Sequence, residues 1–218
     1  MIAKIGRADA ALEARDVHTA IAEMNGVTGL DAAVRAKLES ALAKAHGVTD
    51  PAVYRDPVAT LPDGTKIKPN AGGDKLYYGT DSEQPAQVFA KGLEARGNNT
   101  DLLNHVTQGP DRAFRGTTRW IIQSRGESGA GVWAKEGGWV YEIDGVRGWD
   151  ANASLEHRVP WPDGTHRGNP MRGEHEISIL AGVPSSRIKR AIPMIEENGV
   201  LIPAVAKALD NPNYVPPP

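Results

Sequence analysis

Apolar residues recur at helical spacing near the start of the chain. One stripe falls at i, i+3, i+4 and i+7 and is followed by the stop signal Asn25-Gly26: Val17, Ala20, Ile21 and Met24. A second stripe, which Asp31 can cap and Gly47 can end, consists of Val34, Leu38, Ala41 and Ala45. The pattern predicts a helical hairpin within residues 1–50, a small appendage that carries no evident chemistry.

The pattern changes after residue 50. Residues 51–74 mix prolines and glycines with Asp and Lys, which is typical of a linker and not of a central strand. Short apolar or aromatic runs between glycine-rich turns then predict strands at 75–78, 113–122, 139–143, 174–180 and 187–195. Helices are expected at 85–91 and around 101–105, and the tail 211–218 is expected to be extended or disordered. The chain therefore reads as an α+β catalytic domain over residues 75–218, preceded by the hairpin.

Composition narrows the classes of function. A chain of 218 residues can bury one sizeable core, and its 25 Lys and Arg against 27 Asp and Glu create no overall attraction to nucleic acid or to an anionic membrane. The absence of cysteine excludes disulfides, thiolate metal sites and a cysteine nucleophile, and we expect no metal site. No apolar run is long enough to span a bilayer or to form a signal peptide, so we expect a soluble protein or a piece of a longer one.

Two carboxylates stand close together in the predicted strand 174–180. Glu174 and Glu176 are spaced i, i+2, and side chains alternate across a strand, so both should project from the same face. Neighbouring like charges destabilise a fold unless they meet solvent, a cation or a ligand. A solvated edge strand and a functional site both satisfy this condition.

Five segments in order resemble the catalytic domain of mono-ADP-ribosylating toxins, namely the pertussis toxin catalytic subunit and the pierisin/scabin group. Residues 81–92 are similar to the element Asp-Ser-Arg-Pro-Pro-x-x-Val-Phe-x-x-Gly, and 97–105 are similar to Gly-Asn-Asn…Leu-x-His. Residues 113–118 take the place of Phe-x-Ser-Thr-Ser, whereas 139–155 and 174–184 resemble the two later motifs. The resemblance implies a core of two packed, mainly antiparallel sheets with flanking helices.

The resemblance also implies a substrate, NAD, and roles for three side chains. Breaking the bond between nicotinamide and ribose builds positive charge on the ribose, and a preorganised carboxylate stabilises that charge. By resemblance, Glu176 faces this centre, Glu174 orients or deprotonates the acceptor, and His105 supports the substrate's position. The resemblance places the NAD cleft at Tyr78, Gly79, Thr80, Asp81, Arg115, Gly116, Thr117 and Thr118. Thr117 and Thr118 also suit plain strand packing.

Two cleft positions depart from the family pattern. Gly79 stands where the family carries an arginine that contacts the NAD phosphates or holds the cleft together, and Gly116 replaces the first serine of the Ser-Thr-Ser motif. In a divergent active enzyme, another cation would replace the arginine, with Arg96, Arg115 and Arg119 the nearest candidates. Deliberate disarming of a toxin and natural loss of activity are the alternatives. The intact glutamates favour the divergent enzyme.

The resulting prediction is an NAD-dependent mono-ADP-ribosyltransferase, a bacterial toxin or effector that releases nicotinamide and modifies a macromolecule. In the family, a Glu at position 174 goes with arginine-modifying members and a Gln with guanine-modifying ones, so a protein acceptor is favoured over nucleic acid. Residues 161–173 form either an acceptor-recognition loop or an ordinary surface loop. An NAD glycohydrolase and an inactive binding module are the alternative functions. We expect a secreted or injected effector that acts in the cytoplasm of a target cell, with residues 1–50 docking an adaptor or immunity protein and no membrane partner.

Overall fold

A computed structural model describes most of the predicted catalytic domain. It covers residues 75–216, with gaps at 98–101, 108–111, 113, 122–128, 145, 147, 156–158, 161–164, 168–171 and 181. Within the predicted hairpin, only a few exposed helical positions between 32 and 40 are described, at the place of the second expected helix. The rest of the hairpin, the linker 51–74 and most of the loop 161–173 lie outside the described residues.

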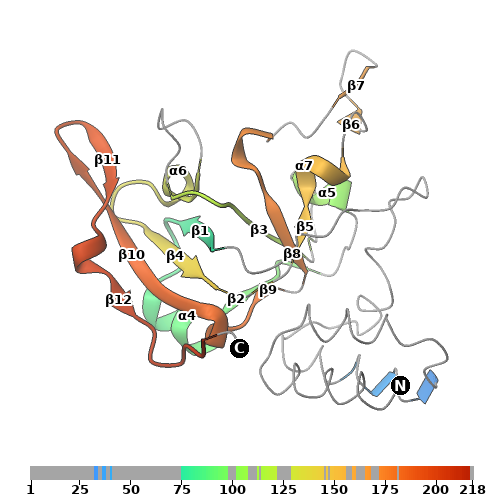
Figure 1. Cartoon of the computed structure of the whole chain (residues 1–218), viewed down its shortest axis with the longest axis horizontal. Coiled ribbons are helices and arrows are strands. Elements are labelled where there is room, and N and C mark those ends of the chain that lie inside the picture. Colours follow the sequence, from blue (N-terminus) through green and yellow to red (C-terminus); the bar gives the residue numbers. More distant parts are fainter. Residues whose placement is uncertain are drawn as a thin grey trace.

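The larger sheet is antiparallel throughout (Figure 1). Its strand order is β1 (Leu76–Thr80), β4 (Trp139–Ile143), β10 (Ile188–Glu197) and β11 (Val200–Pro203), and β12 (Leu209–Asp210) also pairs with β10. Strand β4 lies between β1 and β10, so its residues Val140 to Ile143 are all buried. A nearly continuous apolar strand, rather than an alternating one, is what a central position covered on both faces requires.

A second, smaller sheet carries the acidic segment. Its order is β3 (Phe114–Thr117), β8 (Ile177–Leu180) and β5 (Trp149–Asp150), again antiparallel. The two sheets are joined where Tyr77 and Thr118 exchange backbone hydrogen bonds of 2.7 and 2.9 Å. Two short antiparallel pairs accompany them, β2 (Leu93–Glu94) with β9 (Gly182–Val183), and β6 (Val159–Pro160) with β7 (His166–Arg167). Strands β1 and β3 thus lie side by side.

Short helices flank the sheets, and the core lies between them. The α-helices are α4 (Pro85–Lys91), α5 (Leu102–Val106), α6 (Ala130–Ala134) and α7 (Ala151–Ser154). Three short segments, each a single 3₁₀ turn, are η2 (Arg172–Glu174), η3 (Ser185–Arg187) and η4 (Val205–Lys207). The main core cluster draws on both sheets, with Leu76, Tyr141, Ile143, Ile177, Ile179 and Ile188 all fully or almost fully buried. Burial of this apolar surface holds the β1 and β3 edges together.

The expected α+β class and the two antiparallel sheets are confirmed. The helix expected at 85–91 is present with those bounds, and the one expected around 101–105 occupies Leu102–Val106. The strand expected at 174–180 begins only at Ile177, because Glu174 ends a 3₁₀ turn and His175 adopts a left-handed φ of 46°. The prediction that the two glutamates share one strand face is therefore wrong.

The C-terminal tail is anchored over its described part. The side-chain amide of Asn211 is buried and donates hydrogen bonds of 2.8 and 2.7 Å to the carbonyl oxygens of Ser185 and Ile188. Tyr214 donates a hydrogen bond of 2.9 Å to Asp144, and its backbone N–H donates to Asn211 in a turn. These contacts hold residues 211–214 in a defined turn, in place of the extended or disordered tail that the proline content predicted.

Candidate active site

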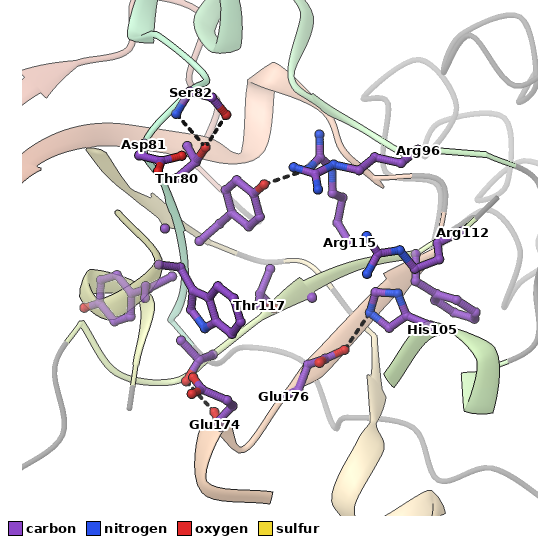
Figure 2. Close-up of a pocket in the computed structure, with 18 of the residues that line it drawn as sticks. Thr80, Asp81, Ser82, Arg96, His105, Arg112, Arg115, Thr117, Glu174 and Glu176 are labelled. Atoms are coloured by element: carbon purple, nitrogen blue, oxygen red, sulfur yellow. Dashed lines mark hydrogen bonds and ion pairs between the residues drawn. The ribbon is translucent and has the colours of Figure 1, made fainter. Parts of the chain in front are cut away.

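A pocket of about 350 Å³ opens where β1, β3 and the start of β8 meet. All of the predicted site residues line it: Tyr78, Gly79, Thr80, Asp81, His105, Arg115, Gly116, Thr117, Thr118, Glu174 and Glu176. They come from elements up to a hundred residues apart in the chain, so only the fold brings them together. Figure 2 shows several of them around the pocket, with Glu176 facing His105.

Glu176 is the most tightly held carboxylate in the pocket. His105 Nε2 lies 2.7 Å from Oε1 of Glu176, and the hydroxyl of Ser178 donates to the same oxygen at 2.5 Å. The other ring nitrogen of His105, Nδ1, is buried and has no hydrogen-bond partner among the described residues. An N–H on Nε2 fits this geometry, because Nε2 is the ring nitrogen that faces the carboxylate oxygen.

The charge state of Glu176 follows from opposing effects. Burial raises the pKa of Glu176, whereas hydrogen bonds from His105 and Ser178 and the positive charge of Arg112 lower it. The donors and the arginine outweigh burial, so the pKa lies below its ordinary value of 4.5. Glu176 is therefore an anion at neutral pH, fixed in orientation and largely removed from water.

Glu174 reaches the same pocket by a different route. The hydroxyl of Thr118 donates to the carbonyl oxygen of Glu174 at 2.6 Å, and the Glu174 carboxylate accepts from the backbone N–H of Gly129 at 3.1 Å. Between the glutamates, the His175 ring packs edge-on against Trp120 with ring centres 4.6 Å apart. The left-handed backbone at His175 turns both carboxylates toward the pocket without a shared strand face.

Arg115 is committed to a hydrogen-bond network inside the pocket wall. Its guanidinium donates to Glu83 at 2.5 Å, to the hydroxyl of Tyr78 at 2.6 Å, and to the carbonyl oxygen of Glu94. Tyr78 in turn donates to Glu83 at 2.7 Å. Burial raises the pKa of Tyr78 to about 12 despite the nearby positive charge of Arg115. Because its donors are used within the wall, Arg115 orders the pocket and leaves little for a ligand.

Three threonine side chains form hydrogen bonds with backbone groups around the pocket. Thr117 donates to the carbonyl oxygen of Ile177 at 2.7 Å and is buried between β3 and β8. Thr80 accepts from the backbone N–H groups of Ser82 and Glu83, at 3.2 and 3.3 Å, and so shapes the turn that follows β1. These contacts, with that of Thr118, fit a strand-packing role. Asp81 lies at the exposed rim, paired with Lys135 at 2.5 Å.

Both unusual glycines lie at close approaches. A Cβ on Gly79 would lie 1.6 Å from the carbonyl oxygen of Ala130 in α6, a distance that no side chain can accept. A Cβ on Gly116 would lie 3.0 Å from Cδ of Glu176 and 3.1 and 3.2 Å from its oxygens. An arginine at position 79 is incompatible with α6 in its present place. The glycine is therefore part of the packing of α6 on β1.

Two further arginines reach the pocket from a pair of facing segments. The backbone N–H of Arg96 donates to the carbonyl oxygen of Arg112 at 3.1 Å in an isolated antiparallel bridge, so their side chains start close together. Figure 2 shows them on the same side of the pocket as Arg115. Arg96 and Arg112 both line the pocket, whereas Arg119 does not.

The sequence missed Arg112, Ser178 and the half-exposed Trp133, all in or beside the pocket. Only Ser178 carries a usable signal, its i, i+2 spacing from Glu176. Among the described residues, no cluster of three or more His, Asp and Glu side chains suits a metal ion. Nor does any described helix have the length and apolar character to cross a membrane.

The two packed sheets and the pocket between them are those of the ADP-ribosyltransferase toxin fold. The chain matches the model of the Scabin-like family over residues 77–214, more than half of its length, and it belongs to that family. The resemblance seen in the sequence is thereby confirmed at the level of family and fold. No curated protein sequence matches the chain.

Solved structures show the same fold. Scabin toxin from Streptomyces scabies in complex with NADH is similar at 21% identity and a TM-score of 0.52, covering 72% of this chain and 84% of that one. A single-substitution variant of scabin from the same organism is similar at 22% identity and a TM-score of 0.55, covering 78% and 90%. A guanine-specific ADP-ribosyltransferase is similar at 19% identity and a TM-score of 0.51, covering 69% and 83%.

Proposed function

We propose that this chain is an NAD-dependent mono-ADP-ribosyltransferase of the toxin or effector type. The observation that carries the proposal is the Glu176 carboxylate, anionic and held on Oε1 by His105 and Ser178. No described residue hydrogen-bonds its other oxygen, Oε2, which leaves that atom for a substrate. A fixed anion in a site sheltered from water is what a developing positive charge on a ribose needs.

The reaction is a displacement at the ribose carbon that bears nicotinamide. The bond between C1′ and the pyridinium nitrogen breaks, and its electron pair leaves with neutral nicotinamide. Glu176 stabilises the resulting oxocarbenium-like centre through Oε2. The acceptor nucleophile then forms a bond to C1′ and gives up its proton, which Glu174 is placed to take because it lines the same pocket. The products are ADP-ribosylated acceptor, nicotinamide and one proton.

Arg96 and Arg112 are the cations best placed to meet the NAD diphosphate. The usual arginine position on β1 is closed by Ala130, and Arg115 is committed to Glu83 and Tyr78. The side chain of Arg96 is 54% exposed, and its weak contact with Glu83, at 3.9 Å, is easily exchanged for a phosphate. The planar guanidinium of an arginine matches the geometry of a phosphate and can donate charged hydrogen bonds to it. The substrate would then extend from the two arginines to Glu176.

Two acceptor classes fit the carboxylate of Glu174. A guanidinium and the amide edge of guanine both present adjacent N–H groups to a carboxylate. Glu at this position favours arginine on a protein, as the sequence pattern predicts, and this is our first proposal. Similarity to a guanine-specific ADP-ribosyltransferase favours guanine, so a nucleic acid or nucleotide is the second.

Membership of a family named for a toxin supports secretion or injection into a target cell as the setting.

The two competing functions are NAD hydrolysis, with water as the acceptor, and NAD or partner binding without turnover. The departures at Gly79 and Gly116 motivate the binding alternative. Their close contacts with Ala130 and Glu176 explain both glycines by packing, without loss of activity.

The decisive experiment follows both halves of NAD. Purified protein is incubated with NAD labelled on the adenylate, with agmatine, a protein lysate, guanosine or DNA as acceptor, and nicotinamide and labelled products are separated by chromatography. We expect nicotinamide release and one labelled acceptor class, and a loss of about a hundredfold or more in Glu176→Gln. Glu136→Gln is the matched control, an exposed glutamate outside the pocket lining.

The outcomes separate the candidates. Free ADP-ribose with no labelled acceptor of any class would establish a glycohydrolase, and no release at high enzyme concentration would leave only binding. Glu174→Gln should keep nicotinamide release while losing transfer, because Glu174 acts on the acceptor and Glu176 on the ribose. Unchanged release in Glu176→Gln would remove that residue from the mechanism.

A further inference from the structure

Ser178 touches the carboxylate of Glu176, and the resemblance to the toxin family assigns it no role. It lies in β8, two residues after Glu176, and its side chain is completely buried. Its hydroxyl donates to Oε1 of Glu176 at 2.5 Å. In a low-dielectric pocket, a hydroxyl donated to an anion is a strong and orienting contact.

The residue directly opposite Ser178 is Gly116. The two are paired in the antiparallel register of β3 and β8, so their α-carbons face each other across the strands. A Cβ on residue 116 would lie 3.0 Å from Cδ of Glu176. Positions 116 and 178 therefore address the same carboxyl group from neighbouring strands, and position 116 is where the resembling toxins carry the first serine of their Ser-Thr-Ser motif.

We propose that Ser178 is a positioning residue for Glu176, which supplies from β8 the hydroxyl that Gly116 cannot supply from β3. The inference rests on the proposed function for its catalytic meaning. The space beside the carboxyl accommodates a side chain from one of the two positions, because a Cβ at 116 already falls within 3.0–3.2 Å of three carboxyl atoms. A glycine on one strand and a serine on the other are thus complementary choices.

The two oxygens of the Glu176 carboxylate have different roles in this arrangement. Ser178 from β8 and His105 from α5 both bind Oε1, with Arg112 the nearby positive charge. Two donors on one oxygen restrict the rotation of the carboxyl plane and leave Oε2 without a hydrogen bond from any described residue. Loss of the serine hydroxyl should loosen this orientation and make the anion less stable, without removing the carboxylate itself.

The first test is Ser178→Ala, a nearly isosteric change. We expect kcat for nicotinamide release to fall by about tenfold, the size of one lost hydrogen bond to a charged group, with KM changed much less. The acid limb of the pH–rate profile should move to higher pH, because the lost donor stabilised the ionised form of Glu176. Ser185→Ala is the matched control, since Ser185 is a buried hydrogen-bonded serine outside the pocket lining.

The second test moves the hydroxyl back across the strands. Gly116→Ser alone should lower kcat by crowding Glu176, whereas Gly116→Ser combined with Ser178→Ala should recover activity relative to Ser178→Ala. A double variant no more active than Ser178→Ala would overturn the exchange. Ser178→Ala with kcat and acid limb like those of the Ser185→Ala control would overturn the positioning role.

A readout independent of turnover separates this inference from the proposed function. The Glu176 carboxyl carbon is followed by NMR as pH is lowered in protein labelled with ¹³C-glutamate, using Glu176→Gln to assign the signal. Ser178→Ala should raise the pKa of Glu176 and Ser185→Ala should leave it unchanged. An enzyme that releases no nicotinamide would refute the proposed function while this titration still decides the contact, and an unshifted pKa in an active enzyme would refute the contact alone.

Discussion

Gly79 of β1 faces the carbonyl oxygen of Ala130 so closely that a Cβ on residue 79 would lie 1.6 Å from it. Helix α6 therefore packs directly on the strand at the position where related toxins carry an arginine. Two other arginines, Arg96 and Arg112, line the pocket, and we propose that they replace this cation. Arg115 is bound to Glu83 and Tyr78 in the pocket wall.

Gly79→Ala is predicted to destabilise the protein by about 1–3 kcal/mol or more, because the added carbon forces backbone movement in β1 or α6. The free energy of unfolding is measured by denaturant titration. Gly173→Ala is the control, since a Cβ there meets nothing within 4 Å, and its effect should stay within about 0.5 kcal/mol. Equal stability of Gly79→Arg and the unaltered protein would contradict the packing of α6 on β1.

His105→Ala should raise the pKa of Glu176, because the imidazole donor stabilises the carboxylate and burial opposes it. The acid limb of the pH–rate profile should then move to higher pH, and kcat should fall by about tenfold. His105→Gln, which retains an N–H donor, should lie between the two. A pH–rate profile in His105→Ala that superimposes on that of the unaltered protein would show that His105 does not act through Glu176.

Arg96→Gln and Arg112→Gln should each weaken binding of NADH by about tenfold, since each removes a charged hydrogen bond to the diphosphate. NADH is the probe for calorimetry because its dihydronicotinamide is a poor leaving group, and adenosine is the phosphate-free comparison. Arg119→Gln provides the control, an exposed arginine outside the pocket lining. If both pocket variants bind NADH like Arg119→Gln, the diphosphate lies elsewhere.

Glu142→Gln should lower the free energy of unfolding by about 1–3 kcal/mol, because its carboxylate, 1% exposed, binds Arg190 at 2.7 Å and pairs with Lys75 and Lys189. Glu197→Gln, an exposed change on the same strand β10, is the control.

The effect at Glu142 should depend on pH in a defined direction. Burial raises the pKa of Glu142, but Arg190 and Lys75 lower it by more than burial raises it. The pKa of Glu142 therefore falls below its ordinary value of 4.5. A lowered folded-state pKa stabilises the protein above about pH 4.5, and this stabilisation is lost as pH falls through the folded-state pKa. The difference between the protein and Glu142→Gln should therefore shrink at acid pH. A difference that stays constant from pH 7 to pH 3 would contradict this assignment.

Much of the fold was readable from local patterns. Proline at the start and glycine after the end of 85–91 mark helix α4, and the apolar run 139–143 marks the buried strand β4. The late start of strand β8, at Ile177 and not at Glu174, could not be predicted. A left-handed residue such as His175 carries no sequence signature in a run of strand-forming neighbours. The anchored tail was missed for a related reason. Asn211 holds it through carbonyl groups of η3 and β10, which lie more than twenty residues away in the chain.

By itself, the sequence determined the order of the motifs, and with it the family, the two-sheet core and many, though not all, of the residues that line the pocket. Tertiary structure alone decided which groups supply each contact. The closure of position 79 by Ala130, the pairing of Gly116 with Ser178, and the approach of Arg96 to Arg112 all arise between segments distant in the chain. Such contacts depend on strand register and on backbone approaches of a few ångströms, which local residue preferences do not encode.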